Sequence, residues 1–283
     1  MHASPRAVWL VSLLTLAAAS KLAAQASIQF LLVEETHYFT QTGDTATVES
    51  SGTSSPWSID VALSGSNLAA FTGSLTFASP AGSGVTGGTA TYSSADDAYR
   101  FYQSYATWTA LNAAFAGGTF DVVYNGTHVP LTLSGNLFPA APTISVTGST
   151  TAWNGGVLTV AAGHDLTLSA NFADAASYGS GNAHFSLGAG GNGYSDSVDL
   201  FGTSGQLVIP AADLVAGQTY NVWVNFAGIM SMSNALSPIT SAAVYSSETD
   251  LTIMVAVPEP ATVAWVAGAL ALGLAGYRRW RLA

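Results

Sequence analysis

The side chains that could carry out chemistry are few and widely spaced. The 283-residue chain has no cysteine, which excludes a thiol nucleophile, a disulfide bond and a cysteine-ligated zinc site. Four histidines, His37, His128, His164 and His184, lie in the body of the chain, and none has the short spacing to another ligand that metal sites usually show. We therefore expect neither a metal site nor a cofactor.

Carboxylates are more numerous, but the sequence does not pair them. Asp96 and Asp97 are adjacent, so on a helix they would point about 100° apart and could not face each other across a substrate. A glycosidase needs two convergent carboxylates in a cleft, about 5 to 10 Å apart. The sequence also lacks a nucleophile elbow, a phosphate-binding loop and a dinucleotide-binding fingerprint. These patterns predict a protein without catalytic residues, which is not an enzyme.

One glycine-rich stretch, Gly190 to Asp196, nearly matches a calcium-binding nonapeptide repeat. Its aspartate falls one residue late, and the stretch occurs once, whereas a solenoid needs several copies. We interpret it as the loop of a β-hairpin. The aspartates in predicted turns still suggest the hypothesis that loops contact calcium or polysaccharide.

The body of the chain is strongly acidic. Between Ser27 and Val257 the only basic residue is Arg100, whereas all but one of the 16 acidic residues of the chain lie there. The net charge of this body is about −14, and such a surface repels nucleic-acid phosphates and anionic lipids. We expect no nucleic-acid partner and no binding to a lipid surface through the body.

The N-terminus has the three parts of a secretory signal peptide. Arg6 supplies a positive charge, residues 7–19 form an apolar segment, and the small residues Ala24 and Ala26 flank Gln25 at a cleavage site. The sequence predicts a signal peptide over residues 1–26, so the mature chain is expected to begin at Ser27. An uncleaved N-terminal anchor is the alternative.

The C-terminus, residues 257–283, also has three parts. They are the tripeptide Pro258-Glu259-Pro260, the apolar run 261–277, and the arginines Arg278, Arg279 and Arg281. As a helix the apolar run would be roughly 25 Å long, which makes it a minimal transmembrane span. The two prolines disfavour helix before residue 261, and the positive-inside rule keeps the arginines in the cytoplasm. The body would then lie across the membrane.

These three parts resemble the PEP-CTERM sorting signal of Gram-negative bacteria. The resemblance implies that a membrane-embedded cysteine transpeptidase, an exosortase, recognises the signal, cuts near Pro258-Glu259-Pro260 and releases the protein to the cell surface. It also implies a precursor held in the inner membrane by its C-terminal helix before processing. We expect an exported surface or extracellular-matrix protein with a structural or adhesive role, and exopolysaccharide as its second partner. The alternative is a secreted polysaccharide-binding or polysaccharide-active protein that uses the same route.

Residues 27–138 are predicted to form a β-rich domain with a short helical insert. The expected strands are 28–33, 36–40, 57–63, 71–77, 87–92, 119–124 and 129–133, the last two joined by a type I′ turn at Asn125-Gly126. The insert is predicted to contain two short helices, over 99–105 and 107–115, with Ser94 as the N-cap of the first. A proline-rich segment at 138–142 marks the predicted domain boundary.

Residues 139–256 are predicted to form an antiparallel β-sandwich. The expected strands are 143–146, 157–160, 166–172, 184–187, 194–201, 206–209, 220–226, and 242–245 or 251–255. The stretch from Leu214 to Val224 resembles the approach to strand F in fibronectin type III and immunoglobulin-like domains. That resemblance implies a tyrosine corner, in which the Tyr220 hydroxyl bonds back to the backbone. The predicted fold is mainly β, with two antiparallel β-sandwich-like domains followed by one transmembrane helix.

Overall fold

The structure, a computed structural model, describes residues 26–50, 55–94, 97–149, 151–173, 177, 183–200 and 204–257. The chain is mainly β, as predicted. The predicted signal peptide up to Gln25 and the predicted sorting signal from Pro258 lie outside the described residues. Among the described residues no helix is long and apolar enough to cross a membrane, and the predicted span 261–277 is not among them.

The elements before the predicted boundary include nine strands and a single α-helix within the described residues. The strands are β1 (Ser27–Gln41), β2 (Thr47–Glu49), β3 (Trp57–Ser66), β4 (Leu75–Ala78), β5 (Gly87–Thr89), β6 (Thr91–Ser93), β7 (Ala98–Tyr105), β8 (Gly118–Tyr124) and β9 (Thr127–Leu133). The helices are the 3₁₀ turn η1 (Leu68–Ala70) and the α-helix α2 (Trp108–Ala114).

The described elements after it include nine strands and the 3₁₀ turn η3 (Ala211–Asp213). The strands are β10 (Thr143–Thr147), β11 (Thr151–Asn154), β12 (Val157–Val160), β13 (Leu166–Asn171), β14 (Ala183–Gly191), β15 (Tyr194–Leu200), β16 (Ser204–Ile209), β17 (Thr219–Ser233) and β18 (Thr240–Val255).

The predicted helix over residues 99–105 is wrong, because this segment is strand β7. It pairs with β3 along its length, from Leu63 opposite Tyr99 to Trp57 opposite Tyr105. Ser94 therefore caps no helix. The second predicted helix is confirmed as α2, whose N-cap Thr107 accepts a hydrogen bond from the Ala110 N–H (3.2 Å).

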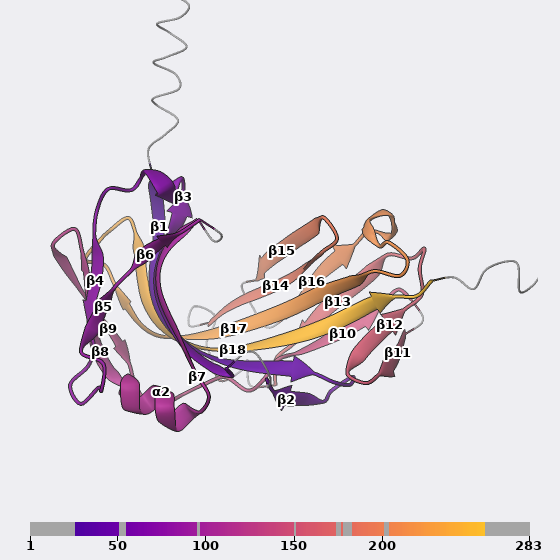
Figure 1. Ribbon diagram of the computed structural model, residues 1–283, viewed down its shortest axis with the longest axis horizontal. Coiled ribbons are helices and arrows are strands. Elements are labelled where there is room, and N and C mark those ends of the chain that lie inside the picture. The colour runs from indigo at the N-terminus through magenta and orange to yellow at the C-terminus, as the bar shows by residue number, and fades with distance from the viewer. Residues whose placement is uncertain are drawn as a thin grey trace, which may run out of the picture.

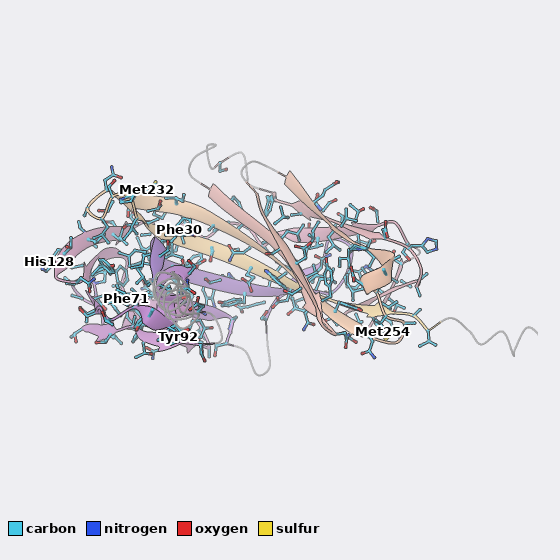
Figure 2. All side chains as sticks on the ribbon, turned by 90° about the horizontal axis from the view of Figure 1, so that it is seen from above. Phe30, Phe71, Tyr92, His128, Met232 and Met254 are labelled. Atoms are coloured by element: carbon cyan, nitrogen blue, oxygen red, sulfur yellow. The ribbon has the colours of Figure 1, made fainter. Side chains whose placement is uncertain are left out.

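One large mixed sheet joins the two halves of the chain. Its central order is β15-β14-β17-β18-β1-β3-β7-β6. In addition, β2 pairs with β1, β12 pairs with β18, and β11 pairs with β12. The sandwiches were expected to be antiparallel, but β18 pairs in parallel with β1 and with β12. Strands β17 and β18 run from one half of the molecule into the other (Figure 1). Viewed from above, His128 and Met254 mark opposite ends of the molecule (Figure 2).

The two ends of the large sheet pack against two smaller sheets. The four-stranded sheet β5-β4-β8-β9 closes the first core, and the three-stranded sheet β10-β13-β16 contributes to the second. The first core includes Ala243 and Tyr245 of β18, which come from beyond the 138–142 segment. The two main cores thus lie on one side of the large sheet, and β18 contributes to both. A smaller buried cluster of Ala227, Ala242 and Val244 lies on the other side of the sheet.

Two predicted turns are confirmed by their backbone geometry. Asn125 (φ 48°) and Gly126 (φ 81°) form the turn between β8 and β9. Positive φ at both central residues is the mark of a type I′ turn, which Asn-Gly favours. Asn192 (φ 51°) and Gly193 (φ 85°) join β14 to β15 in the same way, so the glycine-rich stretch is a hairpin loop.

The predicted tyrosine corner is also present. Tyr220 is fully buried, and its hydroxyl donates to the Asp213 carbonyl (2.7 Å) and accepts from the Val215 N–H (2.9 Å). The hydroxyl thereby satisfies two backbone groups of the loop that enters β17.

We expect Tyr220→Phe to lower the free energy of unfolding by about 1–3 kcal/mol, because both backbone groups lose their partner. Urea unfolding should show a lower midpoint with an unchanged m-value. Tyr92→Phe is the control, since that hydroxyl bonds Asp97 at an exposed site and its loss should cost less than about 0.5 kcal/mol. Equal effects of the two variants would contradict a stabilising role for the corner.

Candidate functional site

The residues predicted for sorting lie almost entirely outside the described part of the chain. Pro258, Glu259, Pro260 and the arginines Arg278, Arg279 and Arg281 are not described, and neither is Ala24. Ala26 is described and directly precedes β1. At the other end, β18 stops at Val255, and Val257 is 66% exposed.

The scattered histidines and acids do not assemble into a metal centre in the described residues. His37 and His128 each contact one carboxylate, of Glu49 (3.0 Å) and Asp121 (2.8 Å) respectively. Asp97 accepts hydrogen bonds from the Leu68 N–H and the Tyr92 hydroxyl, which is a structural role.

A polar surface instead forms on the side of the large sheet that faces away from both cores. Side chains alternate between the two faces of a strand, so burial of Val33 and Tyr245 on the core side turns their even-numbered neighbours to the other face. We call this surface the polar sheet face. It comprises Glu34, Thr36, Tyr38, Trp223, Asn225, Ser246, Glu248 and Asp250.

The register of three neighbouring strands brings these residues together. In the parallel pair of β1 and β18, Tyr38 lies opposite Glu248. In the antiparallel pair of β17 and β18, Asn225 lies opposite Glu248, and Trp223 lies opposite Asp250. Residues from both ends of the sequence therefore share one surface.

Hydrogen bonds hold the middle of the polar sheet face. Ser246 is fully buried and its hydroxyl donates to the Thr36 hydroxyl (2.9 Å). The Asn225 amide donates to Glu248 at 3.4 Å, which is a long hydrogen bond. The hydrogen bonds that the Glu248 carboxylate would make with water are therefore replaced only in part.

Burial in the sheet raises the pKa of the carboxyl groups of Glu34, Glu248 and Asp250 on this face. Burial raises the pKa of Glu248 to about 7, and the negative charges of Asp250 and Glu34 add to that effect. Burial also raises the pKa of Glu34, although a hydrogen bond from Ser246 and the charge of Arg100 act in the opposite direction. The face thus brings three carboxyl groups together where water only partly solvates them.

The only lysine or arginine of the body, Arg100, lies at the Glu34 end of this face. Arg100 donates from Nε to Asp60 (2.8 Å), and its guanidinium lies 5.4 Å from the centre of the Tyr102 ring. Arg100 and Asp60 belong to β7 and β3, and Asp60 lies directly opposite Glu34 of β1. No other lysine or arginine occurs between residues 26 and 257, so Glu248 and Asp250 have no basic neighbour of their own.

Trp223 supplies a flat aromatic surface on the strand next to these acids, and its ring leans away from them. It is half-buried, and its indole ring lies against Gly188 of the neighbouring strand β14. A Cβ atom at position 188 would overlap the ring, so glycine is required for the ring to lie there. An aromatic ring can stack on a sugar ring, and carboxylates on the same face can accept hydrogen bonds from sugar hydroxyls.

Glu35 is a second unusual carboxyl group, on the core side of the same sheet. It is 1% exposed, it lies opposite Tyr245 and Ile59 in the sheet, and neither of its oxygens has a hydrogen-bond partner among the described residues. Burial raises its pKa to about 8, so Glu35 is protonated at neutral pH. It lies away from the polar sheet face and is not part of it.

The sequence contains one signal for the polar sheet face, the spacing of its polar residues. Glu248 and Asp250 are two residues apart, as are Trp223 and Asn225, which is the spacing of residues on one face of a strand. No strand is predicted over residues 246–250, so Glu248 and Asp250 were not expected to lie on one face of a sheet.

Comparisons with known proteins do not identify a family. No family model matches the chain, and no curated protein matches it. Similar solved structures include a cytokine receptor complex, at 16% identity over 71% of this chain and 93% of the other, with a TM-score of 0.22. The human OSCAR ligand-binding domain has 10% identity, coverages of 77% and 97%, and a TM-score of 0.22. Trypsin-activated alpha-2-macroglobulin from Escherichia coli has 10% identity, coverages of 80% and 15%, and a TM-score of 0.20. Similarities of this size carry no functional argument.

Proposed function

We propose that this protein is exported, held in the inner membrane by its C-terminal segment, and processed by an exosortase-like transpeptidase to reach the cell surface or extracellular matrix. The observation that carries the proposal is the order of three features at the C-terminus: Pro258-Glu259-Pro260, the apolar run 261–277, and the terminal arginines. The proposed architecture is two β-sandwich-like units, residues 27–138 and 139–256, followed by a transmembrane helix over 261–277.

The end of the folded body is compatible with processing at this tripeptide. The Ala256 N–H bonds the Val160 carbonyl (2.8 Å), and the next residue, Val257, is largely exposed. A membrane enzyme could reach the following tripeptide without unfolding β18. At the other end, β1 begins at Ser27, directly after the proposed signal-peptide cleavage site.

The role that we propose outside the cell is structural or adhesive and not enzymatic, among exopolysaccharide. The acidic body disfavours nucleic acid and anionic lipid as partners. A β-rich body without cysteine would keep its fold in any redox environment, because nothing in it depends on disulfides.

Replacing Glu259 and Pro260 by alanine tests this proposal. We expect the wild-type protein to be recovered outside the inner membrane with a mass that lacks the tail. The variant should keep its full tail and remain in the inner membrane, because the recognised tripeptide is gone. Intact mass spectrometry of fractionated cells measures both, and Pro139→Ala with Pro142→Ala is a control that removes prolines elsewhere. Retention of residues 261–283 in the wild type would show that the tail is a plain anchor.

The polar sheet face favours the alternative, a secreted polysaccharide-binding or polysaccharide-active protein that uses the same route. Trp223 offers a stacking surface, and the adjacent carboxylates can accept hydrogen bonds from sugar hydroxyls. Release of reducing sugar from the producer's own polysaccharide, lost in Glu248→Gln, would favour an enzyme. Binding without release would favour a binding protein.

A further inference from the structure

The Phe138 ring lies over the buried carboxyl group of Glu35. In the sheet, Glu35 lies opposite Tyr245 of β18. Two residues further along β1 and on the same face, His37 lies opposite Trp57 of β3. The centre of the Phe138 ring is 4.6 Å from that of Tyr245, 5.2 Å from that of Trp57 and 6.4 Å from that of His37. Because the ring contacts these three neighbours, it covers Glu35, which is 1% exposed.

Phe138 belongs to a segment outside helices and strands, residues 137–142, which we call the strap. The strap joins β9 to β10. Pro139 and Pro142 have no N–H to donate, so the strap can form fewer backbone hydrogen bonds than a strand of equal length. The Pro139 carbonyl accepts a hydrogen bond from the hydroxyl of Ser247, which lies opposite His37 in the sheet. This bond and the Phe138 ring hold the strap against the sheet next to Glu35.

The carboxyl group beneath the strap fits its surroundings only while it is protonated. Neither oxygen of Glu35 has a hydrogen-bond partner among the described residues, and burial raises its pKa to about 8. An ionised carboxylate is strongly stabilised by water, and movement of Phe138 would let water reach it. Ionisation of Glu35 and closure of the strap therefore oppose each other.

The other titratable groups around Glu35 change charge in other pH ranges. On β1, burial lowers the pKa of His37, although its hydrogen bond to Glu49 acts in the opposite direction, so the ring is neutral above about pH 6.5. Burial raises the pKa of Tyr245 on β18 and of Tyr105 on β7, so both hydroxyls stay protonated. The strap and α2 carry no titratable side chain, and the residues of β3, β8 and β9 that face the first core are apolar or aromatic.

We propose that the strap is a lid controlled by Glu35, closed over the protonated carboxyl group and opened when this group ionises. Opening moves Phe138 away from Tyr245 and Trp57 and uncovers an aromatic surface with a carboxylate at its centre. The inference goes beyond the proposed function, because it concerns a change within the folded body that sorting does not require.

Proton linkage gives the size of the effect. With the strap open, Glu35 is in water and has its ordinary pKa of 4.5, whereas with the strap closed its pKa is about 8. The ratio of open to closed molecules should therefore rise about tenfold per pH unit between these two values and level off above them. Glu35→Gln cannot ionise and should show no such rise.

Labelling of a single introduced thiol measures strap opening, because the chain has no cysteine of its own. Ser247 is fully buried and bonds the strap, so the thiol of Ser247→Cys should react when the strap opens. The full-length protein in detergent is treated with iodoacetamide from about pH 6 to about pH 8, and mass spectrometry gives the labelling rate. The rate in Ser247→Cys, divided by the rate in the same variant with Glu35→Gln, should rise about fiftyfold over this range. This division removes the pH dependence of the thiol itself.

Ser246→Cys is the matched control for unfolding of the whole sheet. Ser246 is the preceding residue of β18 and is also fully buried, but its hydroxyl bonds Thr36 on the opposite face. Opening of the strap leaves this face covered. The same ratio of rates, with and without Glu35→Gln, should therefore change much less with pH at this position.

Phe138→Leu and Phe138→Ala test the ring itself. A smaller side chain lets water reach Glu35 while the strap is closed, which lowers the pKa of the carboxyl group toward its ordinary value. Labelling of Ser247→Cys should then be faster at about pH 6 and rise less with pH, with a larger change for alanine than for leucine. Urea unfolding checks that each variant is folded.

Three results would overturn the proposal: a ratio of rates at Ser247→Cys that stays constant with pH, an equal rise at Ser246→Cys, or a pH dependence that neither Phe138 variant alters. An equal rise at both thiols would mean that ionisation of Glu35 unfolds the sheet and not the strap alone. These measurements use the purified protein, so they are independent of the Glu259 and Pro260 variant that tests sorting in cells.

Discussion

Replacing Glu35 by glutamine is expected to stabilise the protein at high pH and to have little effect at low pH. Glu35 is buried without a hydrogen-bond partner among the described residues, and its pKa is raised from 4.5 to about 8. Below a pH of about 4.5 the carboxyl group is protonated in both the folded and the unfolded state, and its pKa shift has no effect.

The sign of the pH dependence follows from proton binding. Between about pH 4.5 and pH 8 the folded state holds the Glu35 proton while the unfolded state releases it, so stability falls as pH rises. Above pH 8 the full penalty is present, and a shift of this size corresponds to about 5 kcal/mol. Glutamine has no ionised form and escapes the penalty. The stabilisation by Glu35→Gln should therefore grow from near zero at about pH 4.5 to several kcal/mol at about pH 9.

Urea unfolding of the full chain across this pH range measures the difference. Glu248 and Glu34 add to the fall in wild-type stability, so the comparison between wild type and variant isolates Glu35. Asp213→Asn is the control, because it removes one charge from an exposed position and should show little growth with pH. A constant difference between wild type and Glu35→Gln at all pH values would show that the carboxyl group is not desolvated.

Local chemistry explains which parts of the fold could be predicted. Asn125-Gly126 forms a type I′ turn because both residues tolerate positive φ, and that preference belongs to the dipeptide itself. Tyr220 forms its corner within seven residues of its partners. Features that depend only on a few neighbouring residues could therefore be predicted without knowledge of the rest of the chain.

The helix wrongly predicted over residues 99–105 came from a spacing of aromatic residues that does not distinguish a helix from a strand. Tyr99, Tyr102 and Tyr105 are three residues apart, which fits one face of a helix. In the structure Tyr102 is 50% exposed, whereas Tyr99 and Phe101 pack against the first core. Pairing with β3 decides between helix and strand, and that partner is about 40 residues away in sequence.

The long strands were missed because polar residues interrupt their apolar pattern. Residues 246–250 read as a break between two short strands, yet β18 runs through them with Ser247 and Thr249 fully buried on the core side. Glu34 and Glu35 likewise interrupt the apolar pattern of β1, so two short strands are predicted where the structure has one. The polar sheet face depends on the parallel register of β1 with β18, which no local pattern specifies.

The buried side chain of Gln41 joins the first strand to the three-stranded sheet, and its loss is the second large effect that we expect. Gln41 at the end of β1 is fully buried. Its amide donates to the Ile144 carbonyl (2.9 Å), and its carbonyl accepts from the Ile144 N–H (2.7 Å). Ile144 lies in β10 of the three-stranded sheet, so these two bonds join that sheet to β1.

Gln41→Ala should lower the free energy of unfolding by about 3–5 kcal/mol, because both backbone groups of Ile144 lose their partner away from water and a cavity forms. Gln206→Ala is the matched control, since Gln206 is exposed, bonds only the Ser169 hydroxyl (3.1 Å) and should cost less than about 0.5 kcal/mol. Urea unfolding followed by tryptophan fluorescence measures both. The transition should remain single, because β17 and β18 belong to both cores and neither half can unfold without breaking them. Two separate transitions in the variant would mean that Gln41, and not the shared strands, couples the two halves.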